Sequence, residues 1–126
     1  MRGTDTAFLF PGQGSQSVGM GKELYDNSKA ARSVFHEVDM ALNRPLTKLL
    51  FEGTDETLRE TVNAQPAIMA VSLASMRAIQ DHLGSDYMPR PAVVAGHSLG
   101  EYTALAVAGV LDVGETAWLV QERARL

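Results

Sequence analysis

The sequence predicts an α/β fold in which helices flank a parallel β-sheet. Two short apolar runs, at residues 7–10 and 92–95, have the length and composition of buried strands. Between and after them lie segments whose apolar residues follow the three-and-four spacing of a helix face. Strands that alternate with helices favour a layer built on a parallel sheet. No internal repeat or Gly/Ser linker divides the chain, so a single domain is expected.

The first strand is predicted at residues 7–10, where a Pro-Gly pair stops the apolar run and opens a loop over residues 11–16. A helix is predicted over residues 28–42, because its apolar residues are helically spaced and a serine can cap its start. An Asn-Arg-Pro sequence then breaks it. Two short helices are predicted at residues 45–51 and 55–62, with a glycine turn between them.

A longer helix is predicted from Pro66, where proline suits the first turn, to Leu83, which precedes a glycine. The second strand, at residues 92–95, is followed by a sharp turn and by a helix over residues 99–108. A last helix begins between Asp112 and Thr116. It is predicted to be cut in mid-helix where the chain stops, because neither a glycine nor a proline ends it.

Composition excludes several classes of function. Of the 126 residues 45% are apolar, which is enough for a hydrophobic core, and the net charge of -4 offers nucleic acid no basic surface. The chain has no cysteine, so disulfides, thiol catalysis and cysteine-ligated zinc are excluded, and its three histidines lack metal-ligand spacing. No apolar stretch approaches the ~20 residues that span a bilayer, so a soluble, cytoplasmic protein without a membrane segment is expected.

Residues 96–100 read Gly-His-Ser-Leu-Gly and match the G-x-S-x-G nucleophile elbow. The motif follows a predicted strand and precedes a predicted helix, as its mechanism requires. Ser98 is therefore predicted to attack a carbonyl group, and the backbone N–H of Leu99 to stabilise the oxyanion that develops. The alternative is a glycine-rich turn with an incidental serine.

Serine needs a general base, and the candidates are His36, His82 and His97. His97 adjoins the nucleophile, so the backbone makes it a poor partner for Ser98. The other two lie on helical segments, where a lone histidine is more often a surface or structural residue.

Three segments carry a family resemblance: residues 8–16 (FLFPGQGSQ), 63–68 (NAQPAI) and 96–102 (GHSLGEY). In this order and spacing the chain resembles the acyltransferases that load malonyl groups in bacterial fatty-acid synthesis, and the related acyltransferases of polyketide synthases. The resemblance spans residues 8–123. It implies an α/β-hydrolase-like fold, of which residues 1–126 are the N-terminal part of the large subdomain, with the ferredoxin-like subdomain absent.

The resemblance implies a reaction as well. Ser98 would be acylated by malonyl-CoA and would pass the acyl group to the phosphopantetheine thiol of an acyl carrier protein. The backbone N–H of Gln13 would complete the oxyanion hole opposite Leu99. The family needs no permanently bound cofactor and no metal, and its general-base histidine lies downstream, so the base is expected outside this chain.

The resemblance assigns Arg123 to the free carboxylate of malonate, and Gln65 and His97 to support of the pocket. A guanidinium suits bidentate pairing with a carboxylate. From the residues alone, Arg123 would be a solvated arginine beside two other charged residues, and Gln65 would cap a helix that starts at Pro66.

Three alternatives stay open at this stage. A serine hydrolase or thioesterase would share the elbow, although the loop of Gln13 and the presence of Arg123 favour a transferase. A freestanding polyketide acyltransferase would share all the motifs, and malonyl and branched acyl units are not distinguished. The chain could also be a nonenzymatic fragment that associates with itself or with a complementary segment, since edges and apolar faces of its sheet would be exposed.

Overall fold

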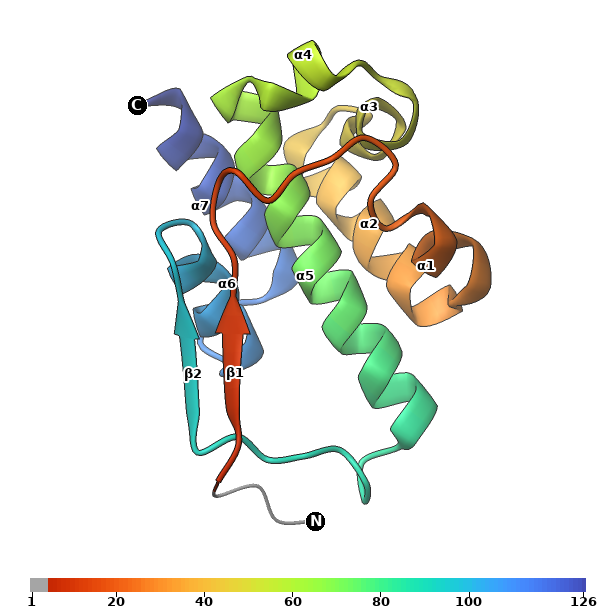
Figure 1. Cartoon of the computed structure of the whole chain (residues 1–126), viewed down its shortest axis with the longest axis vertical. Coiled ribbons are helices and arrows are strands. Elements are labelled where there is room, and N and C mark those ends of the chain that lie inside the picture. Colours follow the sequence, from red (N-terminus) through yellow and green to blue (C-terminus); the bar gives the residue numbers. More distant parts are fainter. Residues whose placement is uncertain (1–4) are drawn as a thin grey trace.

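The sheet consists of two parallel strands in the computed structural model, which describes residues 5–126 (Figure 1). Strand β1 (Ala7–Phe10) pairs with β2 (Val93–Gly96), so that Ala7 lies opposite Val93 and Phe10 lies opposite Gly96. Because the strands are parallel, both carboxyl ends lie at the same edge, and the loop after β1 meets the turn after β2 there. The predicted arrangement of a parallel sheet with flanking helices is confirmed, with a small sheet and a largely helical chain.

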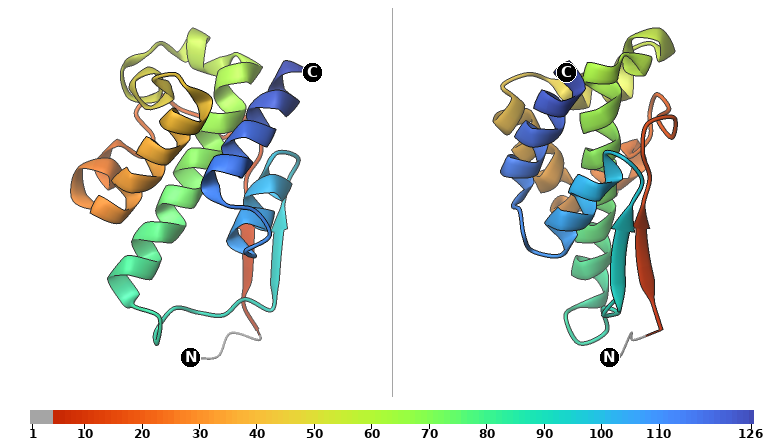
Figure 2. Two further views of the ribbon diagram at one scale, coloured as in Figure 1. Left: turned by 180° about the vertical axis from the view of Figure 1, so that it is seen from behind. Right: turned by 90° about the vertical axis from the view of Figure 1, so that its left-hand side faces the viewer.

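The helices cover one face of this sheet, as the side view in Figure 2 shows. Helix α6 packs against both strands, and α5 runs through the middle of the molecule in contact with α2, α6 and α7. The helices are α1 (Lys22–Asn27), α2 (Lys29–Leu42), α3 (Leu46–Glu52), α4 (Asp55–Arg59), α5 (Thr61–Leu83), α6 (Gly100–Val107) and α7 (Val113–Arg125). Within residues 5–126, no helix is both long and apolar enough to cross a membrane.

The core lies between α2, α5 and α7. Helix α2 contributes Val34, Phe35 and Val38, spaced by one, three and four residues along one face, and all are buried. Helix α5 contributes several buried alanines, including Ala67, and α7 contributes Ala117. Small side chains let these helices approach closely, so that α5 and α7 hold their polar side chains at fixed positions relative to each other.

Capping fixes the starts of two predicted helices. The Ser28 hydroxyl accepts a hydrogen bond from the backbone N–H of Ala31, which confirms the predicted cap of α2. Asp112 and Glu115 form a reciprocal capping box at the start of α7. That capping box sets the residue at which α7 begins.

The predicted start of the long helix at Pro66 is wrong, because α5 begins five residues earlier, at Thr61. Pro66 has no N–H and cannot bond the carbonyl of Val62 four residues before it. That carbonyl instead accepts a hydrogen bond from the side chain of Arg44, with Nη2 at 2.7 Å. An outside donor thus satisfies the group that the proline leaves unpaired. The short helix α1 was also not predicted.

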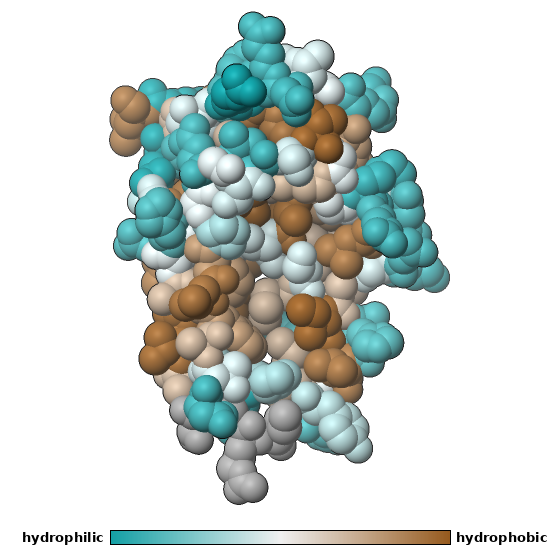
Figure 3. Space-filling model, in the orientation of Figure 1, coloured by the Kyte–Doolittle hydropathy of each residue, from teal (hydrophilic) through white to brown (hydrophobic). Residues whose placement is uncertain are grey.

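The face of the sheet turned away from the helices is apolar and exposed. Leu9 is 74% exposed and Val93 is 55% exposed, and hydrophobic side chains gather over the two strands on the face seen in Figure 3. We expect this face to make copies of the chain associate, because apolar surface removed from water contributes about 25 cal/mol per Å².

Light scattering across a dilution series tests this association. Leu9→Lys should shift the chain towards the monomer, because it places a charge in the apolar face. Met40→Lys, on the exposed side of α2, is the matched control and should not change the mass. A wild-type chain that stays monomeric and monodisperse at every concentration would contradict the expectation.

Candidate functional site

Ser98 lies in the turn between β2 and α6, and its backbone is in the left-handed region with φ of 56°. Such a conformation is uncommon for a residue other than glycine and is found at functional sites. Gly96 and Gly100 bracket it. A Cβ atom on Gly96 would overlap the backbone of Gly100, and a Cβ atom on Gly100 would overlap the carbonyl of Phe10. The turn is therefore the predicted elbow, and its glycines are required by close backbone contact.

The loop after β1 lies directly against this elbow. The backbone N–H of His97 donates to the carbonyl of Phe10 at 3.1 Å. A Cβ atom on Gly12 would stand 2.5 Å from the carbonyl oxygen of His97, so the two backbones are in contact there as well. The loop that carries Gln13 is thereby held beside the turn that carries Ser98.

Two backbone N–H groups are available at this junction, those of Gln13 and Leu99. Within residues 5–126 neither donates a hydrogen bond to the protein. Leu99 is the N-cap residue of α6 and its side chain is fully buried, which anchors the elbow in the core. The Gln13 side chain donates to the Thr61 hydroxyl at 3.1 Å and so ties the loop to the start of α5. Free N–H groups at a helix start favour developing negative charge.

Arg123 connects the elbow with α5. Its Nη2 donates to the Ser98 hydroxyl oxygen at 2.6 Å, and its Nη1 donates to Oε1 of Gln65 at 2.7 Å. The guanidinium also lies 5.9 Å from the centre of the Tyr102 ring, where a cation interacts favourably with an aromatic face. Arg123 thus contacts Ser98, 25 positions before it in the sequence, and Gln65, 58 positions before it.

These contacts decide two alternatives that the residues alone left open. Arg123 is half-buried and bonded to the serine, so it is not a solvated surface arginine. Gln65 lies inside α5, is 5% exposed and does not cap the helix. A cationic fork fixed on one side by an amide, and next to a serine hydroxyl, can hold an anionic group of a molecule whose carbonyl that serine attacks.

The three histidines make contacts with other parts of the chain. His97 is exposed, with its Nδ1 and carbonyl towards Gly12. His36 shares a hydrogen bond of 3.0 Å with the hydroxyl of Tyr25, and His82 lies in the last turn of α5. In the described part of the chain, therefore, no histidine hydrogen-bonds Ser98.

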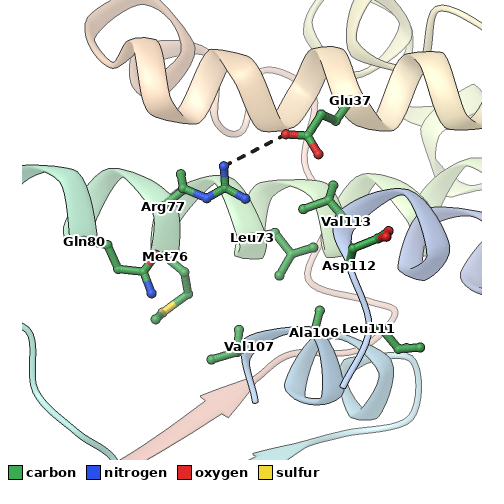
Figure 4. A pocket seen from close by; sticks show the side chains of 10 residues that line it. All are labelled: Glu37, Leu73, Met76, Arg77, Gln80, Ala106, Val107, Leu111, Asp112 and Val113. Atoms are coloured by element: carbon green, nitrogen blue, oxygen red, sulfur yellow. Dashed lines mark ion pairs between the residues drawn. The ribbon is translucent and has the colours of Figure 1, made fainter. Parts of the chain in front are cut away.

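A separate cavity of about 220 Å³ lies between α2, α5 and the connection from α6 to α7 (Figure 4). Its walls are mixed: Leu73 and Val113 are apolar, while Arg77 and Glu37 form a loose ion pair of 4.0 Å across it. None of the predicted site residues lines it. No three histidine, aspartate or glutamate side chains among residues 5–126 cluster as metal ligands do.

The elbow geometry predicts a large effect of one methyl group. Gly100→Ala is expected to lower the free energy of unfolding by at least about 2 kcal/mol, because backbone atoms cannot move away from the new Cβ. Gly114→Ala in α7 is the matched control. Its Cβ would meet only ordinary contacts, the nearest at 3.5 Å, so stability should be unchanged or raised by up to about 1 kcal/mol. Urea unfolding followed by circular dichroism measures both, and equal stabilities would contradict the close contact.

Comparison with known proteins agrees with this geometry. The family model "Acyl transferase domain" matches residues 7–126. The malonyl CoA-acyl carrier protein transacylase of Bacillus subtilis (strain 168) is 46% identical over 117 residues, which are 93% of this chain and 35% of that protein. That of Escherichia coli O157:H7 is 42% identical and the match covers 97% of this chain and 38% of that protein. The chain thus spans little more than a third of these relatives.

Solved structures give the same result. An acyl-carrier-protein-S-malonyltransferase from Bartonella henselae superposes with a TM-score of 0.86 at 49% identity, over 95% of this chain and 38% of that one. A malonyl-transacylase in complex with its type II PKS acyl-carrier protein has a TM-score of 0.86 at 39% identity, with the same coverage. The predicted resemblance is confirmed, and the chain belongs to the acyl transferase domain family.

Proposed function

We propose that residues 1–126 form the N-terminal part of the large α/β subdomain of a malonyl-CoA:acyl-carrier-protein S-malonyltransferase. It would move a malonyl group from malonyl-CoA to the phosphopantetheine thiol of an acyl carrier protein through an acyl-serine intermediate. The observation that carries this proposal is the position of Arg123, bonded both to Ser98 and to Gln65. A hydrolase of neutral esters has no need for a cation at its nucleophile.

In the first half-reaction the Ser98 oxygen attacks the thioester carbonyl and loses its proton to a general base. The carbonyl oxygen becomes an oxyanion, to which the N–H groups of Leu99 and Gln13 donate. The C–S bond then breaks and coenzyme A leaves as its thiol after protonation. In the second half-reaction the carrier thiol attacks the acyl-serine, and the serine hydroxyl is restored. This general base is not among the residues that hydrogen-bond Ser98 within residues 5–126.

Arg123 would change partners during the reaction. In the substrate-free chain its Nη2 occupies the Ser98 oxygen, while Nη1 is held by Gln65. A carboxylate is a stronger acceptor than a hydroxyl, so a malonyl group would draw Nη2 away and leave the serine free to attack. The bond to Gln65 keeps the guanidinium plane oriented during this exchange. Arg123 therefore supports a substrate that carries a free carboxylate.

A carrier-dependence assay tests the transferase function against hydrolysis. A chimera that joins residues 1–126 to the rest of the Bacillus subtilis transacylase supplies the parts of that relative which this chain does not span. With malonyl-CoA and acyl carrier protein we expect malonyl-carrier to form, with little free malonate. Rapid release of malonate that does not depend on the carrier would show a hydrolase instead.

The pathway is proposed as fatty-acid synthesis in the cytoplasm. Leu99 and Tyr102 in the elbow motif favour a freestanding enzyme over a domain embedded in a polyketide synthase. A relative named polyketide synthase GfsB, from Streptomyces halstedii, is nevertheless 44% identical over 126 residues. Comparing carriers from the two pathways in the same assay distinguishes them, since the proper carrier should be acylated faster.

A further inference from the structure

We propose that Arg44 is a positioning residue for Arg123: it fixes the register of α7 on α5 and thereby places the guanidinium of Arg123 between Gln65 and Ser98. Arg44 follows α2 and does not itself touch the nucleophile. The inference deepens the proposed function, because the consequence of misplacing Arg123 for malonyl binding rests on that function. The geometric part of the inference stands without it.

Each of the three guanidinium nitrogens of Arg44 donates a hydrogen bond to a different acceptor. Nε donates to Oε1 of Gln121 at 2.8 Å, Nη1 to Oδ1 of Asn63 at 2.7 Å, and Nη2 to the carbonyl of Val62 at 2.7 Å. Two acceptors belong to the first turn of α5 and one belongs to α7. Asn63 and Gln121 are each 5% exposed, so their amides have little access to water. A single planar group thus ties the two helices together.

Pro66 explains why an outside donor is needed at this place. As a proline inside α5, it leaves the carbonyl of Val62 without its helical partner. A helix carbonyl without a hydrogen-bond partner is unfavourable, and Arg44 supplies the missing donor. The guanidinium that donates to the Val62 carbonyl of α5 also donates to Gln121 of α7. One side chain therefore satisfies the carbonyl and links the two helices.

The link lies within one helical turn of the catalytic contact. Asn63 precedes Gln65 by two residues, and Gln121 precedes Arg123 by two residues. Successive residues of an α-helix turn by about 100° and rise 1.5 Å, so residues two apart project to nearly opposite sides, about 3 Å apart along the axis. Arg44 therefore ties α5 to α7 on one side of the pair, and the bond from Arg123 to Gln65 ties them on the other.

Charge and shape make arginine the suitable residue. Burial lowers the pKa of the Arg44 guanidinium, and the nearby charge of Arg125 lowers it further, while Asp39 raises it. Its direct partners are two neutral amides and one carbonyl, not carboxylates. Geometric fit to three acceptors, rather than ion pairing, therefore holds it in place, and a lysine lacks the planar fork that reaches all three.

Nitrogen-15 NMR of the arginine side chains in the 126-residue chain tests the placement directly. The signals of Arg123 are assigned by their loss in Arg123→Lys. In the wild type we expect resolved, slowly exchanging Nη signals, since both Nη groups are bonded. In Arg44→Met these signals should move to the averaged position of a free arginine, and in Arg44→Lys they should move part of the way.

Arg77→Met is the matched control, because Arg77 lines the separate cavity and makes only the loose contact of 4.0 Å with Glu37. It should leave the Arg123 signals unchanged. Since Arg44→Met removes the donor of three acceptors at once, Gln121→Met is a second variant that removes only the α7 end of the link. A folded Arg44→Met or Gln121→Met chain with wild-type Arg123 signals, even at a lower Tm, would overturn the proposal, because it would show a structural role alone.

Titration with malonate separates this inference from the proposed function. If both hold, malonate shifts the Arg123 signals of the wild type, and its Kd rises about tenfold or more in Arg44→Met, as expected for the loss of one aligned charged hydrogen bond. If malonate shifts nothing in the wild type but Arg44→Met still displaces the Arg123 signals, positioning holds and the carboxylate role fails. If malonate binds both proteins with equal Kd, the positioning role fails.

Discussion

Ser98→Ala is expected to abolish the covalent malonyl adduct that malonyl-CoA forms on the chimera with the Bacillus subtilis transacylase. Removing the hydroxyl removes the proposed nucleophilic oxygen, and loss of a nucleophile costs at least about 10³-fold in rate. Intact-mass spectrometry after a short incubation with malonyl-CoA measures the adduct. The wild-type chimera should gain one malonyl group, and the variant should gain none.

Ser85→Ala is the matched control for this experiment, since Ser85 is exposed in the connection between α5 and β2, away from the elbow. It should be acylated like the wild type. An adduct that persists in Ser98→Ala would assign the nucleophile to another residue. Parallel measurements on the isolated 126-residue chain show whether its elbow can be acylated without the segment that the chimera adds.

The local parts of this site could be predicted from the sequence because they depend on neighbouring residues. The elbow at residues 96–100 requires a strand, two small residues and a helix in immediate succession, and the capping residue Ser28 acts within one turn. The structure confirms each of these. Such features result from steric and hydrogen-bonding rules that operate over a few residues.

The long-range contacts could not be derived in this way. Nothing in the spacing of Gln65 and Arg123 indicates that they touch, and it was the family resemblance that assigned both to the pocket. The contact between Arg44 and Gln121, which are 77 positions apart, was not predicted. A polar residue in a helical segment has the same sequence pattern whether it faces water or a buried partner, so only the packing of α5 against α7 distinguishes the two.

The start of α5 illustrates the same limit. Proline is typical of the first turn of a helix, which predicted a start at Pro66. The structure continues the helix upstream to Thr61 because Arg44, distant in sequence, donates to the carbonyl that the proline frees. A tertiary contact thus overrides a local preference. The contact of Arg44 with Val62 therefore underlies both the earlier start of α5 and the proposed positioning role of Arg44.

Arg123→Met is expected to reverse the preference for a carboxylated acyl donor. In the proposed function one guanidinium pairs with the free carboxylate of malonate, and a hydrogen bond to a charged group contributes about 1.5–3 kcal/mol. Acylation of Ser98 by malonyl-CoA should therefore slow about 10- to 100-fold. Acylation by acetyl-CoA, whose acyl group has no free carboxylate, should not slow.

The ratio of the two acylation rates, measured on the chimera, is the decisive quantity, because a general loss of folding would lower both rates together. Arg125→Met provides the control: Arg125 is exposed, pairs with Glu122 at 2.8 Å on the surface, and should leave the ratio unchanged. Arg123→Lys should fall between the two, since it keeps the charge but loses the fork that binds Gln65 and the substrate at once. If an Arg123→Met chimera with the circular dichroism and Tm of the wild type slowed malonyl and acetyl transfer equally, Arg123 would serve the serine and not the carboxylate, and the malonyl specificity would have to reside elsewhere.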